Sequence, residues 1–388
     1  MNDEEQKVIL LVDDTPVNLQ MVQAILKDSY RIRVATNGFK ALDLASSEPT
    51  PNLILLDVSM PGMDGFEVCT RLKASPSTRD IPVIFLTGQT EIEDETKGFE
   101  VGGVDYIHKP FSSAVVRARV HTHLVLRHIR EQLSHQLTAI RSELETARQI
   151  QLSILPGKMP ETNSLDIAAR YLPMTAVAGD FYDFIVVDDN HLGVLVADVS
   201  GHGMPAALIS SMLKIALAAQ STSASDPAQV LLGLNQALCG KFQGHFVTAA
   251  YVFIDMENNI LRYAGAGHPP LITKDNVSAK VDEILENGLF LGAFPHATYT
   301  SVEMPFKTGD WCLLYTDGIP ETANSDGEEF GIGRLKIFLQ NDESRDSDTF
   351  VDRFLERLRN WADRSSHHEV DDDITFLAIH RIAPKDVP

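Results

Sequence analysis

Aspartates lie at the ends of four apolar segments in the C-terminal two thirds of the chain. Asp180 stands beside 181–185, Asp198 follows 192–197, Asp317 follows 311–316, and Asp371, Asp372 and Asp373 precede 374–379. We expect these segments to be strands, because short apolar runs bounded by turn residues are typical of buried strands. A sheet would bring the four ends together. Carboxylates without His or Cys partners suit Mg²⁺ or Mn²⁺, and two such ions would activate a water and hold a phosphate.

The turn after Asp198 is rich in glycine, and Pro205 opens a helix directly behind it. Glycines let the backbone approach a bound group closely, so this turn favours a metal site. His202 lies in the same turn. It is a candidate general acid, or a loop histidine that the backbone satisfies.

A second set of polar residues follows the strands predicted in the N-terminal third. Asp13 and Asp14 follow 8–12, Asp57 follows 53–56, Thr87 follows 82–86, and Lys109 follows 104–107. Strands that alternate with helical segments predict a parallel α/β sheet, whose sites lie at the carboxyl ends of its strands. Crowded carboxylates repel one another unless a cation neutralises them, so the pattern predicts a magnesium ion here.

Residues 7–125 resemble response-regulator receiver domains in the segments 57–65 and 109–111 as well as in these strand ends. The resemblance implies a doubly wound, flavodoxin-like parallel sheet and a cognate histidine kinase that phosphorylates Asp57. It also implies roles for the other residues. Asp13, Asp14, Asp57 and the carbonyl of Ser59 would hold Mg²⁺, Lys109 would pair with the phosphoryl group, and Thr87 would bond to it on switching.

Residues from about 150 to 379 resemble the bacterial branch of the metal-dependent (PPM) serine/threonine protein phosphatases. The motifs are 179–183, 198–203, 266–270, 315–318 and 372–375. The resemblance implies an antiparallel β-sandwich with flanking helices and two Mn²⁺ or Mg²⁺ ions. Asp180 and Asp198 would bridge the ions, Asp317 and either Asp372 or Asp373 would bind the second, and the carbonyl of Val199 the first.

A helical segment joins the two regions. Apolar residues recur at spacings of four and three, which is a heptad pattern: Leu133, Leu137, Ile140, Leu144 and Ala147. We expect a parallel dimeric coiled coil, with a helix folded back onto one of its own domains as the alternative. The predicted domains are a receiver at 1–125, a coiled-coil linker at 126–156 and a phosphatase at 157–388.

The chain has 54 acidic and 33 basic residues among 388, a net charge of −21. This balance argues against nucleic acid or an anionic membrane as a partner, because either would need a basic face. The three cysteines have no metal or disulfide spacing, and we find no signal peptide or membrane span. The expected location is the cytoplasm.

Together the two resemblances predict a two-component response regulator that controls a protein phosphatase. Phosphorylation of Asp57 would govern hydrolysis of phosphoserine or phosphothreonine, with an anti-sigma factor antagonist as the usual substrate in a partner switch. The alternative is a non-catalytic adaptor that binds a sigma factor or its regulator. The complete set of acids favours the enzyme.

Overall fold

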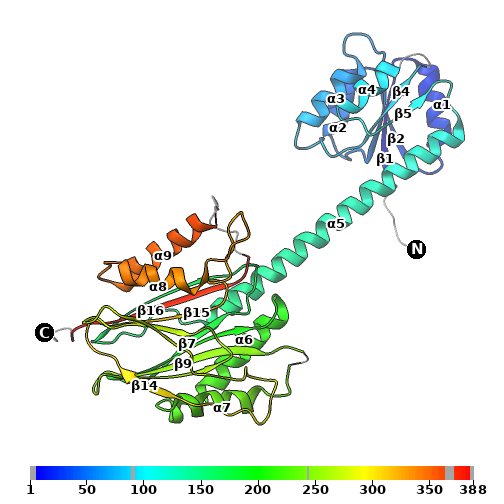
Figure 1. Ribbon diagram of the computed structural model, residues 1–388. Coiled ribbons are helices and arrows are strands. Elements are labelled where there is room, and N and C mark those ends of the chain that lie inside the picture. The colour runs from blue at the N-terminus through cyan, green and yellow to red at the C-terminus, as the bar shows by residue number, and fades with distance from the viewer. Residues whose placement is uncertain (1–5, 89–91, 243, 363–370, 385–388) are drawn as a thin grey trace. The chain divides into compact units, whose positions relative to one another are not determined.

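The computed structural model describes residues 6–88, 92–242, 244–362 and 371–384. The chain divides into two compact units, Met1–Ile140 and Arg141–Pro388 (Figure 1). Each unit has its own hydrophobic core.

The first unit is a five-stranded parallel sheet in the order β2-β1-β3-β4-β5. Its strands are β1 (Val8–Val12), β2 (Arg31–Ala35), β3 (Leu53–Asp57), β4 (Val83–Thr87) and β5 (Asp105–His108). Its helices are α1 (Pro16–Leu26), α2 (Gly38–Ser46), α3 (Gly65–Ala74), α4 (Ile92–Glu100) and the start of α5 (Ser113–Ile154). Buried residues form a core on each face of the sheet. The predicted doubly wound fold is confirmed.

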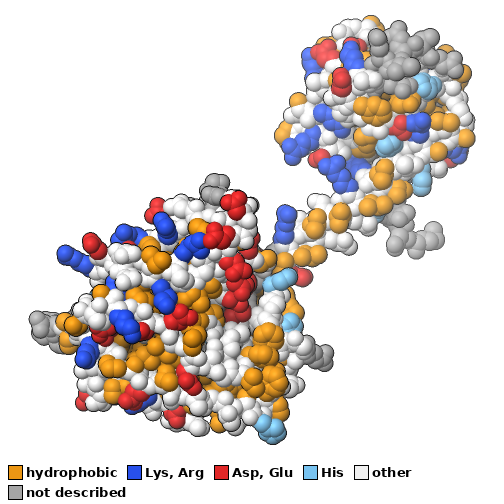
Figure 2. All heavy atoms as spheres, in the orientation of Figure 1, with side chains coloured by type: hydrophobic (Ala, Val, Ile, Leu, Met, Phe, Trp, Pro, Cys, Tyr) orange, Lys and Arg blue, Asp and Glu red, His pale blue; other side chains and the backbone are white. Residues whose placement is uncertain are grey.

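Helix α5 is 42 residues long and ends at Ile154, just before Pro156. It begins inside the first unit, earlier than the predicted linker, and its residues Val116 and Val120 are fully buried in the core of that unit. Further along, an apolar stripe is about half exposed (Figure 2) and comprises Leu126, Ile129, Leu133, Leu137 and Ile140. The coiled coil itself stays a prediction.

The second unit is a β-sandwich. One sheet has the order β13-β10-β9-β8-β7, with β14 also paired to β10; the other has the order β12-β11-β15-β16-β6. The strands of the first are β7 (Phe181–Asp188), β8 (His191–Val199), β9 (Val247–Asp255), β10 (Ile260–Ala266), β13 (Asn287–Gly288) and β14 (Val302–Pro305). Those of the second are β6 (Leu165–Leu172), β11 (Leu271–Lys274), β12 (Val281–Ile284), β15 (Trp311–Tyr315) and β16 (Ile374–Arg381). All neighbours except β10 and β13 are antiparallel, as predicted.

Helices cover the outer faces of the sandwich (Figure 1). They are α6 (Met204–Ala218), α7 (Pro227–Leu238), α8 (Gly331–Asn341) and α9 (Ser347–Trp361), with a short 3₁₀ turn at Ser221–Ser223. Helix α9 buries Phe350 and Phe354, and the Phe354 ring lies 4.7 Å from that of Phe376 in β16. Within the described ranges, no helix combines the length and apolar character needed to cross a bilayer.

Candidate functional site

The receiver acids converge at the carboxyl ends of β1 and β3. Ligand oxygens of Asp13, Asp14 and Asp57 all lie within 4.8 Å of one another; Asp13 and Asp57 are buried and Asp14 is exposed. Lys109 Nζ donates to Asp13 Oδ2 at 2.9 Å and to Asp57 Oδ1 at 2.8 Å. The backbone N–H of Thr15 further holds Asp13 at 2.8 Å. Sequence reasoning therefore located this cluster.

The charges of this cluster fit a divalent cation. Burial raises the pKa of Asp57, and Asp13 and Asp14 raise it further while Lys109 opposes them. Burial by itself would lower the pKa of Lys109, but its hydrogen bonds to Asp57 and Asp13 outweigh that effect and raise it. Three carboxylates against one ammonium leave net negative charge, which an ion with oxygen ligands such as Mg²⁺ would offset.

Thr87 and Ser59 flank the cluster. Thr87 ends β4 and is buried, with its Oγ1 3.1 Å from His108 Nδ1. Ser59 lies two residues past the end of β3 and is exposed. The ring of Tyr106, next to Ile107 on β5, lies 5.0 Å from the His108 ring and under the Arg119 guanidinium.

In the second unit, the acids come from both sheets of the sandwich. Asp180 immediately precedes β7 and Asp198 lies near the end of β8, whereas Asp317 follows β15 and Asp372 and Asp373 precede β16. Thr316, which follows β15, joins the two sheets through one hydrogen bond and is held to β16 of its own sheet by another. Thr316 Oγ1 donates to Asp180 Oδ2 at 2.8 Å and accepts from the Thr375 N–H at 2.9 Å.

Asp372 and Asp373 have different surroundings. Asp373 is buried, and its two oxygens accept the backbone N–H groups of Met174 at 2.8 Å and Gly179 at 2.7 Å. Asp372 is exposed and accepts the neighbouring backbone N–H of Asp373 at 2.8 Å. Asp373 thus ties the segment before Asp180 to β16, while Asp372 keeps an oxygen open to solvent.

The pKa values of these acids show that they repel one another. Burial raises the pKa of Asp198 to about 7, with further contributions from Asp317, Asp372 and Asp373. Complete burial and the charge of Asp198 raise the pKa of Asp180 well above its usual value. Burial and Asp372 raise the pKa of Asp317. This donor set fits divalent cations with a preference for oxygen ligands, although within the described residues only the receiver acids meet as three within 4.8 Å.

Two family models match the chain. The response regulator receiver domain matches residues 9–121, and the family described as Stage II sporulation protein E (SpoIIE) matches residues 188–382, half of the chain. The chain belongs to the SpoIIE family. Its C-terminal unit is a serine phosphatase domain of that family, joined to a receiver domain.

Individual proteins are similar to different shares of the chain. Phosphoserine phosphatase RsbU of Bacillus subtilis is 32% identical over 245 residues, which are 62% of this chain and 71% of RsbU. A probable cyclic di-GMP phosphodiesterase of Vibrio cholerae serotype O1 is 43% identical over 144 residues, 37% of this chain. The chain spans only 32% of the length of that relative. The solved PP2C domain of SiaA from Pseudomonas aeruginosa matches with a TM-score of 0.56 at 25% identity, covering 64% of this chain and 99% of that domain.

The turn behind Asp198 in this SpoIIE-family domain requires glycine. Gly201 and Gly203 have φ values of 87° and 81°, which non-glycine residues rarely adopt. A Cβ on Gly179 would lie 2.7 Å from the carbonyl oxygen of Val199, so glycine lets the segment before Asp180 touch this turn. His202 is exposed on the turn.

Sequence reasoning missed three residues that hold this site. Thr316 lies in the 315–318 motif, in which the sequence indicates a metal-ligand role for Asp317 alone. Gln151, buried near the end of α5, donates to the Ala178 carbonyl at 2.6 Å and accepts the Ala178 N–H at 3.0 Å. Its one signal in the sequence is a polar residue in an apolar heptad pattern. His245 binds the Ser200 carbonyl through Nδ1 at 2.7 Å, and nothing in its sequence neighbourhood indicated this.

Proposed function

We propose that this chain is a metal-dependent phosphatase for phosphoserine or phosphothreonine in proteins, controlled by phosphorylation of Asp57. The observation that carries the proposal is the joining of acids from four distant segments at one end of the sandwich, through Thr316 and Asp373. Membership of the SpoIIE family and the similarity to phosphoserine phosphatase RsbU support the reaction class.

Asp180, Asp198, Asp317, Asp372 and the Val199 carbonyl would hold two Mn²⁺ or Mg²⁺ ions. Such ions supply positive charge that stabilises a phosphate group as negative charge develops on it. Asp373 would position the ligands, because both of its oxygens already accept backbone N–H groups. Thr316 would orient Asp180 in the same way. His202 stays a candidate general acid on an exposed turn.

In the receiver, Asp57 would accept the phosphoryl group from a histidine kinase. Asp13, Asp14, Asp57 and the carbonyl of Ser59 would hold Mg²⁺. Lys109 already bonds both buried acids and would offset charge on the transferred group. Thr87 would donate a hydrogen bond to that group, and its hydroxyl would then have to give up its present contact with His108 Nδ1.

Control would pass through α5. Its exposed apolar stripe supports a homodimer through a parallel coiled coil, because burying about half of five large side chains favours association. Gln151, near the end of the same helix, binds Ala178, two residues before Asp180. A shift of this helix would therefore move the segment that carries the proposed metal ligand Asp180. By resemblance to the family, the substrate class is a phosphorylated anti-sigma factor antagonist.

The test compares the wild type with Asp198→Ala on p-nitrophenyl phosphate and on a phosphoserine protein, with Mn²⁺ present. Each protein is assayed with and without a phosphoryl analogue on Asp57. We expect metal-dependent turnover that the substitution abolishes, and the analogue reveals whether phosphorylation activates or inhibits. Absence of turnover in wild type under both receiver states would refute the enzyme and favour the adaptor.

A further inference from the structure

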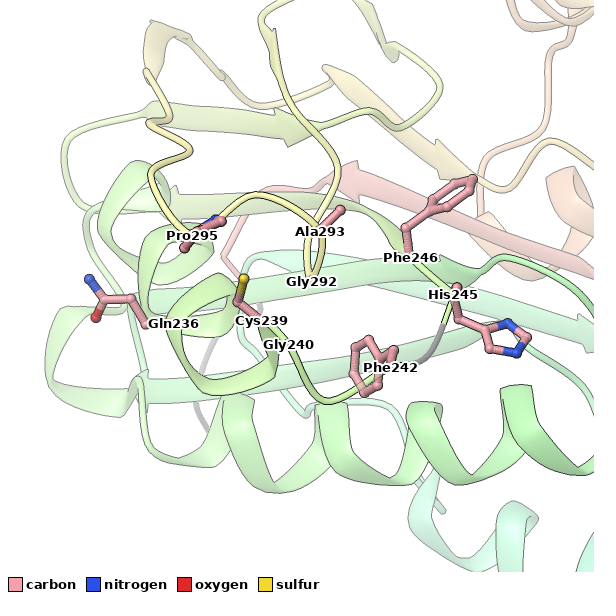
Figure 3. A pocket seen from close by; sticks show the side chains of 10 residues that line it. Gln236, Cys239, Gly240, Phe242, His245, Phe246, Gly292, Ala293 and Pro295 are labelled. Carbon is pink, nitrogen blue, oxygen red and sulfur yellow. The ribbon is translucent and has the colours of Figure 1, made fainter.

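A hollow of about 800 Å³ opens beside the turn that follows Asp198 (Figure 3). Its wall includes Cys239, Phe242, His245, Phe246, Ala293 and Pro295. In Figure 3 the loop that carries Ala293 and Pro295 lies across the hollow from the Cys239–Phe242 segment. The volume is within the range of pockets that bind ligands.

Three hydrogen bonds attach one wall of this hollow to the proposed metal centre. The Ser200 N–H donates to the Phe246 carbonyl at 2.9 Å, and the Phe246 N–H donates to Ser200 Oγ at 2.9 Å. His245 Nδ1 lies 2.7 Å from the Ser200 carbonyl and must be the donor, because a carbonyl oxygen only accepts. Ser200 is two residues past Asp198, so these bonds tie this wall of the hollow to the turn that follows a proposed metal ligand.

Hydrogen bonds also hold the opposite wall of the hollow. Asn235 on α7 is fully buried, accepts the Gly292 N–H at 2.8 Å and donates to the Phe294 carbonyl at 2.8 Å. Gly240 N–H donates to the Gly292 carbonyl at 3.2 Å. Side chains also pack against each other: the Phe290 ring lies 4.3 Å from that of Phe246 and is tilted by 37° from it. Contacts between these segments therefore hold both walls of the pocket.

The charge of the pocket indicates what it binds. None of the described residues that line it is an Asp, Glu, Lys or Arg, although the chain carries a net charge of −21 and the neighbouring site is a cluster of acids. Phe294, on the loop above the pocket, is 42% exposed and Leu289 is 51% exposed. A wall that has aromatic rings and no Asp, Glu, Lys or Arg among its described residues favours an apolar group, which gains by leaving water.

We infer that this pocket binds an apolar side chain of the substrate protein close in sequence to its phosphorylated serine. The inference rests on the proposed function, since the phosphate must sit at the acids for its flanking residues to reach the pocket. The pocket would make the enzyme select phosphoserines by their neighbours, and His245 and Phe246 would link that selection to the turn behind Asp198.

The experiment uses synthetic phosphoserine peptides in which a leucine replaces an alanine at each position in turn beside the phosphoserine. The kcat/KM of each peptide and of p-nitrophenyl phosphate is measured on the full chain with Mn²⁺. We expect leucine at one position to raise kcat/KM about tenfold over alanine, since a few buried methylenes discriminate to that extent. Ala293→Trp, at an exposed position, fills the pocket and should bring the ratio to about one. Val277→Trp, 90% exposed on another loop, is the matched control and should keep the preference.

The outcomes separate the two proposals. Turnover of p-nitrophenyl phosphate with equal kcat/KM for all peptides, or a leucine preference that survives Ala293→Trp, overturns the pocket alone. If wild type hydrolyses neither kind of substrate, the proposed function fails. In that case the peptides are labelled with fluorescein and their binding is measured by fluorescence polarisation. Tighter binding of one leucine peptide that is lost in Ala293→Trp supports the pocket as a binding site for an apolar side chain, and equal affinities for all peptides overturn that inference.

Discussion

In the phosphatase unit, hydrogen bonds from uncharged groups fix the positions of two carboxylates, those of Asp180 and Asp373. Burial raises the pKa values of Asp180, Asp198 and Asp317, and repulsion from the neighbouring carboxylates raises them further. Hydrogen bonds from Thr316 and from two backbone N–H groups hold Asp180 and Asp373 against that repulsion. Such supporting partners commonly matter for metal affinity almost as much as the ligands do.

Thr316→Val should weaken Mn²⁺ binding because it removes the hydrogen bond to Asp180 and leaves the Thr375 N–H without its acceptor. We expect an affinity about 10- to 100-fold lower by calorimetric titration. Thr316→Ser keeps the hydroxyl and should recover most of the affinity. Equal affinities for the valine and serine variants would contradict the positioning role.

His268 should make the fold less stable in acid. Burial lowers its pKa to about 3, and its Nδ1 lies 2.8 Å from Thr248 Oγ1. The unfolded chain binds a proton near the ordinary histidine pKa of about 6.5 while the folded chain does not, so the free energy of unfolding falls as pH drops from about 6.5 to 3. The slope for this one group is at most about 1.4 kcal/mol per pH unit. The free energy of unfolding, measured for wild type and His268→Gln at several pH values between about 3 and 6.5, should fall more steeply with decreasing pH in wild type. Equal slopes for the two proteins would refute the role of His268.

At the scale of elements, α5 is the part that serves both units. Its early residues complete the receiver core, and Gln151 near its other end enters the core of the phosphatase unit beside α6. A helix that packs into a core at each end and is exposed in its middle suits a connector, because the exposed part gains stability only by packing against another helix.

Gln151→Leu should destabilise the phosphatase unit and disturb its control by the receiver. The leucine cannot bond the N–H and carbonyl of Ala178, and an unpaired buried polar group costs about 1–3 kcal/mol. We expect a lower melting temperature and a smaller change of activity when the analogue occupies Asp57. Gln149→Leu, which loses only an exposed bond to Glu145, is the control. Two variants of equal stability and equal response would argue against this contact.

At the scale of the whole molecule, the apolar stripe of α5 predicts the oligomeric state. Leu133 and Leu137 are 54% and 47% exposed. Replacing both with aspartate places charges at the predicted dimer seam, so sedimentation should change from about twice 42.8 kDa to a single chain. Ser142→Asp, off the stripe, should leave the dimer intact. A wild-type monomer at micromolar concentration would refute the coiled coil.

The sequence by itself determined the two fold classes and most of the candidate acids. Buried strands correspond to short apolar runs in the sequence, and the acids at their ends can be identified because they terminate those runs. Asp13, Asp57, Asp198 and Asp317 could be named for this reason. The start of α5 at Ser113 was harder to predict, since its first turns are apolar on the side that packs on the receiver and the heptad pattern becomes clear only later.

Only the tertiary structure decided which groups meet across the two sheets. Asp372 and Asp373 are neighbours with the same side chain, and the difference between them is that Gly179 and Met174, nearly two hundred residues earlier, donate to Asp373. The roles of Thr316 and Gln151 and the pocket beside His245 arise in the same way. These features are hydrogen bonds and a cavity formed between segments that are distant in the sequence. A local hydrophobic pattern shows which residues are buried, but it does not show which distant residues they contact.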